Sequence, residues 1–232
     1  GSLSWSDGVH VVRSPVVVRP TAISAPTSVS GVGTAGSTAY DVTFGFAGDF
    51  AAAGHGLVAA QVEAGNVIDD PANDINAALG TGVGMTMHVI DIPAGSVYAR
   101  FALFDGETDG ATDDLDLYVF DPYFNFAGGS GSASSAEQVD VPFPTPGTYY
   151  VIVHGWQTEG PDANYLLSSW GVPGAAAGNL TVNAPTAATL GGNGNIQLDW
   201  SGLESDKRYL GLVSYATGGQ LVGSTVVNVT TK

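Results

Sequence analysis

Residues 114–120 read DLDLYVF, and residues 146–153 read PGTYYVIV. The first stretch alternates apolar residues with polar or aromatic ones, and the second is rich in β-branched and aromatic residues after a Pro-Gly turn signal. Both patterns are typical of β-strands. Similar runs recur at 97–104 and 196–200, and Gly, Asn, Asp or Pro separates such runs at short intervals. Short strands at this spacing predict an all-β protein built as a jelly roll or β-sandwich.

Outward from these strands, the pattern divides the chain into four segments. They are a hairpin over 1–20, a main β-sandwich domain over 21–172, a small-residue linker over 173–178, and a small fibronectin- or immunoglobulin-like β-sandwich module over 179–232. One short helix is expected over 71–79, with Asp70 as its N-cap, Pro71 in its first turn and Gly80 at its end.

The hairpin over 1–20 consists of two predicted strands that flank a turn at Asp7-Gly8. Two strands alone are marginally stable, so we expect the hairpin to pair with other residues. The chain begins at Gly1 without an initiator Met or a signal-peptide pattern. We therefore expect the sequence to be a fragment of a larger protein.

Charge and composition exclude several classes of function. The 232 residues carry 22 acidic and 6 basic side chains, a formal net charge of −16. Such a surface repels phosphate backbones and anionic membranes, so neither nucleic acid nor membrane is expected as a partner. The chain has no cysteine, so no disulfide framework or thiolate metal site is expected. No apolar run approaches the roughly 20 residues of a spanning helix.

The densest chemistry lies in the acidic stretch 105–121, which reads DGETDGATDDLDLYVFD. Oxygen-bearing side chains recur there at the spacing of an EF-hand-like calcium loop, with Gly110 at its sixth position. The candidate calcium ligands are Asp105, Glu107, Asp109, Asp113 and Asp116. The alternative is a solvated acidic turn between two strands.

No catalytic residue is predicted within the chain. The four histidines lack the i, i+4 spacing of a zinc site, and neither a G-x-S-x-G elbow nor a phosphate-binding loop is present. The aromatic residues Tyr123, Phe124, Phe126 and Trp156 are candidates for a contact surface toward a partner domain or an insoluble substrate. Their alternative role is to cover the end of the sandwich core.

Two stretches resemble known families. The order DLDLYVFDP at 114–122, PGTYYVIV at 146–153 and then Asn164-Tyr165 resembles the bacterial pre-peptidase C-terminal domain, a jelly-roll-like sandwich appended to secreted proteases. The opening GSLSWSDGVHVVRSPVVVRP, at 1–20, resembles the closing hairpin of the fibronectin-III-like domain that follows the catalytic domain in many subtilases.

These resemblances imply a parent protein that is a secreted bacterial serine endopeptidase of the subtilisin-like type. Its catalytic Asp, His and Ser would lie upstream, because the Gly-Thr-Ser-Met-Ala nucleophile motif is absent here. The chain is thus expected to be a non-catalytic C-terminal accessory region that stabilises, matures or positions the protease, with the catalytic domain as its partner in cis. The alternatives are a module that binds insoluble protein or polysaccharide, and a standalone adhesin-like surface protein.

Overall fold

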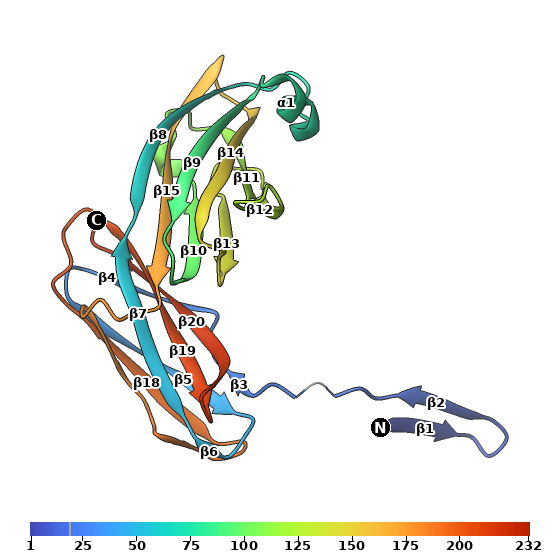
Figure 1. Cartoon of the computed structure of the whole chain (residues 1–232). Coiled ribbons are helices and arrows are strands. Elements are labelled where there is room, and N and C mark those ends of the chain that lie inside the picture. The colour runs from blue at the N-terminus through green and yellow to red at the C-terminus, as the bar shows by residue number, and fades with distance from the viewer. Residues whose placement is uncertain (19) are drawn as a thin grey trace.

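The computed structural model describes residues 1–18 and 20–232, and these are almost entirely β-structure, as the sequence predicts. Two β-sandwiches lie one above the other, and a two-stranded hairpin projects from the lower one (Figure 1). Among the described residues, no helix is both long and apolar enough to cross a membrane.

The outer sandwich is built from strands at both ends of the chain. Its first sheet has the order β16 (Leu180–Asn183), β18 (Asn193–Trp200), β5 (Gly36–Phe44) and β3 (Ile23–Ser24). Its second sheet has the order β4 (Ser28–Val32), β20 (Gln220–Thr230), β19 (Arg208–Thr217) and β7 (Ala51–Ala59), and a short pair joins β17 (Ala187–Ala188) to β6 (Gly48–Asp49). Period-two alternation turns Tyr40, Val42 and Phe44 of β5 into a core that they share with Ile196 and Leu198 of the paired strand β18.

The inserted sandwich occupies 61–173. One sheet has the order β13 (Gln138–Pro142), β10 (Ser96–Ala102), β15 (Asp162–Pro173) and β8 (Gln61–Ile68). The other has the order β12 (Phe126–Ser130), β11 (Asp114–Phe120), β14 (Gly147–Gln157) and β9 (Met85–Ile92). Leu115, Leu117 and Val119 of β11 are fully buried in its core, so the DLDLYVF stretch forms a central strand as predicted.

The sheet pairing divides the segment 21–172 that the sequence groups together. Strands β4 to β7 pair with strands after residue 179, and only Ala60 separates β7 from β8. Period-two patterning identifies a strand but not its partner, and β5 pairs with β18 across 150 or more residues of sequence. The small-residue stretch at 173–178 is the return path from β15 to the outer sandwich, and Ala176 within it bridges to Gly56.

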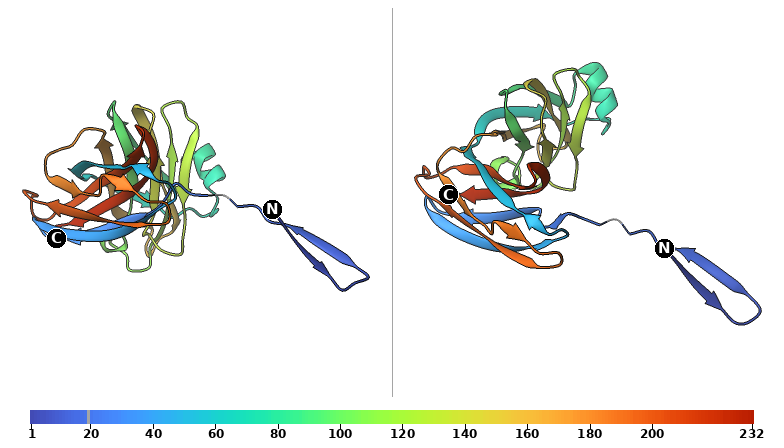
Figure 2. Two further views of the ribbon diagram at one scale, coloured as in Figure 1. Left: turned by 90° about the horizontal axis from the view of Figure 1, so that it is seen from below. Right: turned by 60° about the horizontal axis from the view of Figure 1, so that its bottom comes forward.

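The N-terminal hairpin is present as predicted, with β1 (Ser2–Ser6) and β2 (Val11–Pro15) joined through Asp7 and Gly8; residue 19 of the predicted segment lies outside the described residues. Figure 2 shows this hairpin projecting well clear of both sandwiches. Its apolar side chains are consequently exposed, including Trp5 at 54%. Within the described chain β1 and β2 pair only with each other.

The helix differs from its prediction. It spans α1 (Ile75–Thr81), its N-cap is Asp74 rather than Asp70, and it ends at Gly82 in the left-handed region with φ of 76°. Asp70 is engaged elsewhere, because its carboxylate accepts backbone hydrogen bonds from Ala72 and Asp74 and a hydrogen bond from a buried histidine. Asp74 is the next acidic residue along the chain, and it caps the N-terminus of α1 instead.

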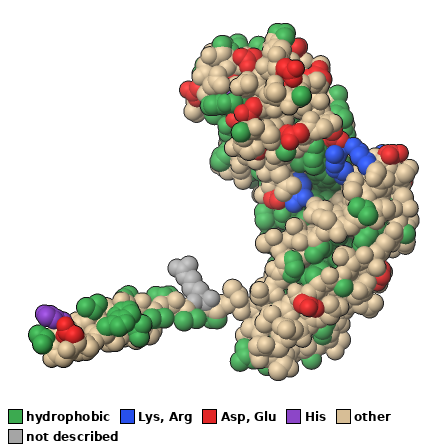
Figure 3. All heavy atoms as spheres, turned by 180° about the vertical axis from the view of Figure 1, so that it is seen from behind, with side chains coloured by type: hydrophobic (Ala, Val, Ile, Leu, Met, Phe, Trp, Pro, Cys, Tyr) green, Lys and Arg blue, Asp and Glu red, His purple; other side chains and the backbone are tan. Residues whose placement is uncertain are grey.

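An apolar cluster joins the two sandwiches. It contains Tyr98, Ala102, Trp170 and Val172 of the inserted sandwich and Leu210, Leu212 and Val226 of the outer one. Lys and Arg side chains gather at this junction, whereas Asp and Glu are spread over the inserted sandwich (Figure 3). Four of the six basic residues of the chain line pockets there: Arg100, Lys207, Arg208 and Lys232.

Candidate functional site

The outer face of the sheet β12-β11-β14-β9 carries an unusual set of side chains. Because Leu115, Leu117 and Val119 point into the core, the alternate residues Asp116, Tyr118 and Phe120 point outward. In register beside them on β14 lie His154 opposite Asp116, Ile152 opposite Tyr118, and Tyr150 opposite Phe120. The face therefore has an aromatic end and an acidic end.

At the aromatic end, Phe124 stacks on Tyr150 with ring centroids 4.3 Å apart, and Phe126 packs edge-on against Phe120 at 5.8 Å. The 121–125 turn that presents Phe124 is held by Asp121, whose carboxylate accepts backbone hydrogen bonds from Tyr123 and Asn125. Phe124 itself has φ of 62°, a strained value for a non-glycine residue.

These predicted contact residues are open to solvent. Tyr123, Phe124 and Phe126 are 73%, 66% and 62% exposed, and Trp156 is 39% exposed. Exposure of this size means that the first three do not close the core. Trp156 lies at the other end of the face, beside the acidic residues.

At the acidic end, a pocket of about 610 Å³ opens between the strands and the 129–133 segment. Asp114, Asp116, Tyr118, Phe126 and Trp156 line it together with residues 129–133. Burial, followed by the neighbouring charges of Asp116 and Glu137, raises the pKa of Asp114. Burial and the charge of Asp116 raise the pKa of Tyr118 to about 12. The phenol therefore stays protonated and donates to Asp116 Oδ2 at 3.2 Å.

Behind the pocket, His154 lies fully buried between two carboxylates. Its Nε2 is 2.9 Å from Asp70 Oδ2, and its Nδ1 is 3.5 Å from Asp116 Oδ2 without completing a hydrogen bond. Burial alone would lower the pKa of His154, but the carboxylates of Asp116 and Asp70 outweigh burial and raise it. The hydrogen bond with His154 in turn lowers the pKa of Asp70. His154 thus links the loop before α1 to the sheet.

The five predicted calcium ligands lie in separate surroundings. Glu107 pairs with both Arg208 and Lys232 at the junction, so its charge is already neutralised. Asp109 accepts two hydrogen bonds from Asn164, and Asp113 accepts backbone hydrogen bonds from Gly110 and Glu159.

Asp105 shares a surface pocket with Asp113, while Asp116 faces His154 on the outer face of the sheet. Over the described residues, no group of three or more His, Asp or Glu side chains is arranged to hold a metal ion. Calcium binding stays a prediction, because the full ligand set is not assembled in one place.

Two further histidines form hydrogen bonds with neighbouring polar groups. His88 bridges Glu63 and the Tyr165 hydroxyl, whereas His55 bridges Ser214 and the carbonyl oxygen of Gly174. The Ser214–His55 pair therefore has a carbonyl where a catalytic triad places a carboxylate.

Sequence reasoning missed Asp70, Asp114 and His154 as members of the site. For Asp114 and His154 the available signal was period two, which places both on the outward face once the buried positions of β11 and β14 are assigned. Asp70 lies in a loop, and no periodic signal indicates its position.

Comparison with known families matches residues 89–155 to the model of the bacterial pre-peptidase C-terminal domain. This part of the chain is therefore similar to a pre-peptidase C-terminal domain. The match runs from β9 to β14, and the structure shows that β8 and β15 complete the same sandwich on either side of it.

Among curated proteins, the chain is 31% identical over 110 residues to pyrolysin of Pyrococcus furiosus, a subtilisin-like protease. These residues are 47% of the chain but 7% of pyrolysin, so the chain spans a small part of that relative. The two matches confirm the predicted resemblance to the accessory domains of subtilisin-like proteases.

Among solved structures, a glycosyl hydrolase family 2 member from Bacteroides cellulosilyticus aligns over 63% of this chain and 28% of its own. It has 8% identity and a TM-score of 0.25, which is too low to indicate a shared fold.

Proposed function

We propose that this chain is a non-catalytic C-terminal accessory region of a secreted bacterial subtilisin-like serine endopeptidase, which it stabilises or positions in cis. The observation that carries the proposal is the pre-peptidase C-terminal domain match over 89–155, joined to the pyrolysin match. Both relate the chain to proteases through a region outside any catalytic centre.

The architecture supports a positioning role. One residue joins β7 to β8, and the apolar cluster buries Trp170 and Leu210 between the sandwiches. Such a junction makes the two sandwiches a single rigid spacer. The exposed hairpin, with Leu3 and Trp5 open to solvent, offers apolar surface for an upstream domain of the same chain.

The first test is genetic. The reading frame upstream of residue 1 should encode a subtilisin-like catalytic domain with its Asp, His and Ser. A frame without a protease domain would overturn the proposal. The second test is enzymatic: the isolated chain should not hydrolyse casein, and robust hydrolysis sensitive to serine-protease inhibitors would contradict a non-catalytic role.

The aromatic end of the sheet face favours a second candidate function, binding of insoluble protein or polysaccharide. Phe124 stacked on Tyr150 forms a flat exposed surface that a strained backbone holds in place. Retention of the chain on such a solid, and its loss in Phe124→Ala and Phe126→Ala variants, would support this function. The exposed Val32→Ala change on the outer sandwich is the matched control. Equal retention of all variants would contradict it.

A further inference from the structure

The acidic end of the sheet face is a pocket that combines two kinds of wall. Asp114 and Asp116 supply carboxylates, while Tyr118, Phe126 and Trp156 supply aromatic rings. Trp156 is 39% exposed and Phe126 is 62% exposed, so part of the aromatic lining remains open to an incoming group.

One carboxylate of this pocket has an oxygen without a partner. Asp114 Oδ1 is buried without a hydrogen-bond partner. Asp116 is only 6% exposed, and Glu137, 2% exposed, adds a third negative charge whose field reaches Asp114. Buried carboxylates that repel one another cost free energy unless a cation approaches them.

A separate observation is the orientation of His154. Its side chain is fully buried, its Nδ1 has no hydrogen-bond partner, and that atom faces Asp116 Oδ2 from 3.5 Å behind the pocket. The imidazole is already committed through Nε2 to Asp70. It therefore gives no hydrogen bond to either Asp114 or Asp116.

The aromatic walls distinguish between cations. The rings of Tyr118 and Trp156 lie 6.2 Å and 6.1 Å from the His154 ring, each edge-on to it, and both line the pocket in front of that histidine. A small metal ion gains little from aromatic faces and keeps its water. A guanidinium is weakly hydrated, stacks on aromatic rings and pairs with carboxylates in a planar fork.

No Lys or Arg of the described residues lines this pocket. Arg100 pairs with Asp140, and Arg208 and Lys232 pair with Glu107, all at the junction between the sandwiches. A net charge of −16 attracts cationic segments of other polypeptides toward the surface.

We propose that this pocket binds the arginine side chain of an extended polypeptide. The guanidinium lies against Asp114 and Asp116, and its alkyl stem lies against Trp156 and Tyr118. This inference does not rest on the proposed protease association, because the site lies wholly within the inserted sandwich and can be tested on the 232-residue chain alone.

The test is calorimetric titration of the chain with acetyl-Gly-Arg-Gly-amide at low salt. The matched probe acetyl-Gly-citrulline-Gly-amide keeps the shape and removes the charge. We expect at least about tenfold weaker binding of the citrulline peptide, since hydrogen bonds between charged groups are stronger than those from a neutral donor. Binding of the arginine peptide should weaken as ionic strength rises.

Two variants locate the site. Asp114→Asn removes a charge from an unpartnered oxygen and should weaken arginine binding at least about tenfold without lowering the melting temperature. Trp156→Ala should weaken it severalfold, and Asp199→Asn on the outer sandwich is the control that should leave it unchanged. Equal affinity for the arginine and citrulline peptides, or full affinity in both site variants, overturns the proposal. So does a pocket that binds calcium ions but not the arginine peptide.

Discussion

Replacing His154 by Ala should destabilise the inserted sandwich strongly. The side chain is fully buried, and its removal leaves Asp70, 3% exposed, and Asp116, 6% exposed, facing each other without a cation. Removing one partner of a buried ion pair costs about 3–5 kcal/mol. For a sandwich of this size each kcal/mol lowers the melting temperature by about 4 °C, so we expect a fall of roughly 12–20 °C.

The pH dependence separates this electrostatic effect from the cavity left by the smaller side chain. The pKa of His154 is raised above its ordinary 6.5, so its stabilisation is fully present below about pH 6.5 and is lost as pH rises through the folded-state pKa. The pKa of Asp70 is lowered below its ordinary 3.8, so its stabilisation is present above about pH 4 and is lost as pH falls through that lower value. The full contribution therefore lies between about pH 4 and 6.5.

Differential scanning calorimetry at pH 5.5 and pH 9 measures both effects. The gap in melting temperature between the native chain and His154→Ala should be widest at pH 5.5 and narrower at pH 9. His10→Ala, on the exposed hairpin, is the control and should not shift the main transition. A gap below about 3 °C at pH 5.5, or one that widens toward pH 9, would refute the reasoning.

Three further outcomes are expected. Glu107→Gln should lower the melting temperature at low salt by an amount equivalent to about 1 kcal/mol of stability. The loss should be smaller in 0.5 M NaCl, because the paired Arg208 and Lys232 are partly exposed to the screening ions. A loss that does not depend on salt would contradict an ionic origin. If the acidic stretch binds calcium, saturating calcium should raise the melting temperature. At a hundredfold excess over the dissociation constant, the free energy of unfolding should rise by about 2.7 kcal/mol. That rise should disappear in Asp109→Asn, and identical melts in calcium and in chelator would remove the site. A polypeptide cut to 61–173 should fold, because it keeps every strand of both its sheets. One cut to 21–172 should be less stable, because β5 loses its long partner β18 and keeps only the short strand β3. Circular dichroism and proteolysis compare the two, and equal stability would contradict the strand assignment.

The strands of the inserted sandwich were predictable because their signal is local. Alternation alone predicts the buried face of β11, formed by Leu115, Leu117 and Val119. The Pro-Gly turn signal indicates where β14 begins. The insertion was not predictable in the same way. Pairing of β5 with β18 depends on matching two surfaces far apart in sequence, and the alternation of each strand is satisfied by any apolar partner.

In the candidate site, too, only the residues with a local sequence signal were predictable. The exposed aromatic residues Phe124 and Phe126 were identified because they cluster in sequence next to a turn. The loop spacing assigns Asp116 to the predicted calcium site, but its position in β11 turns its side chain to the outer face beside His154. Spacing along the chain describes ligands in a loop, and it fails where a strand turns consecutive residues to opposite faces.

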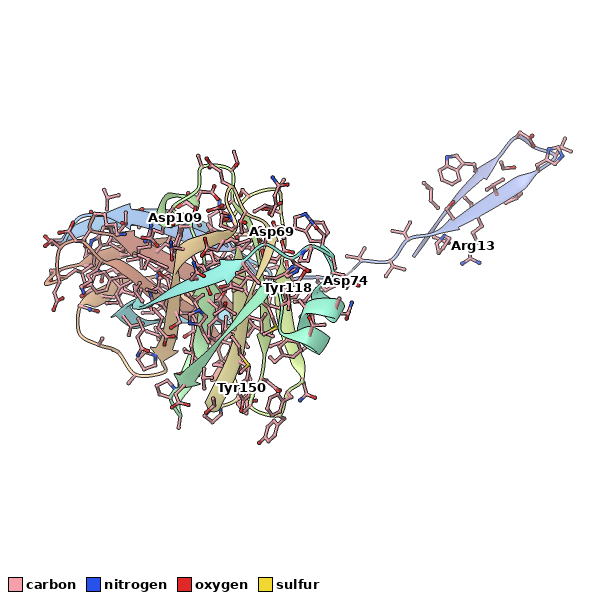
Figure 4. All side chains as sticks on the ribbon, turned by 90° about the horizontal axis from the view of Figure 1, so that it is seen from above. Arg13, Asp69, Asp74, Asp109, Tyr118 and Tyr150 are labelled. Atoms are coloured by element: carbon pink, nitrogen blue, oxygen red, sulfur yellow. The ribbon has the colours of Figure 1, made fainter. Side chains whose placement is uncertain are left out.

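The insertion itself restricts what the region can do. Two chain crossings join the sandwiches, and the shorter one is Ala60 alone, whose backbone N–H donates to the carbonyl oxygen of Arg208 at 2.8 Å. A single residue spans only about 3.5 Å, so the inserted sandwich cannot swing without breaking that hydrogen bond and the apolar cluster around Trp170. Figure 4 shows Tyr118 and Tyr150 on the inserted sandwich, far from Arg13 on the hairpin. The inserted sandwich therefore keeps one orientation relative to the outer sandwich, so any group bound on its sheet face is presented in a fixed direction from the outer sandwich.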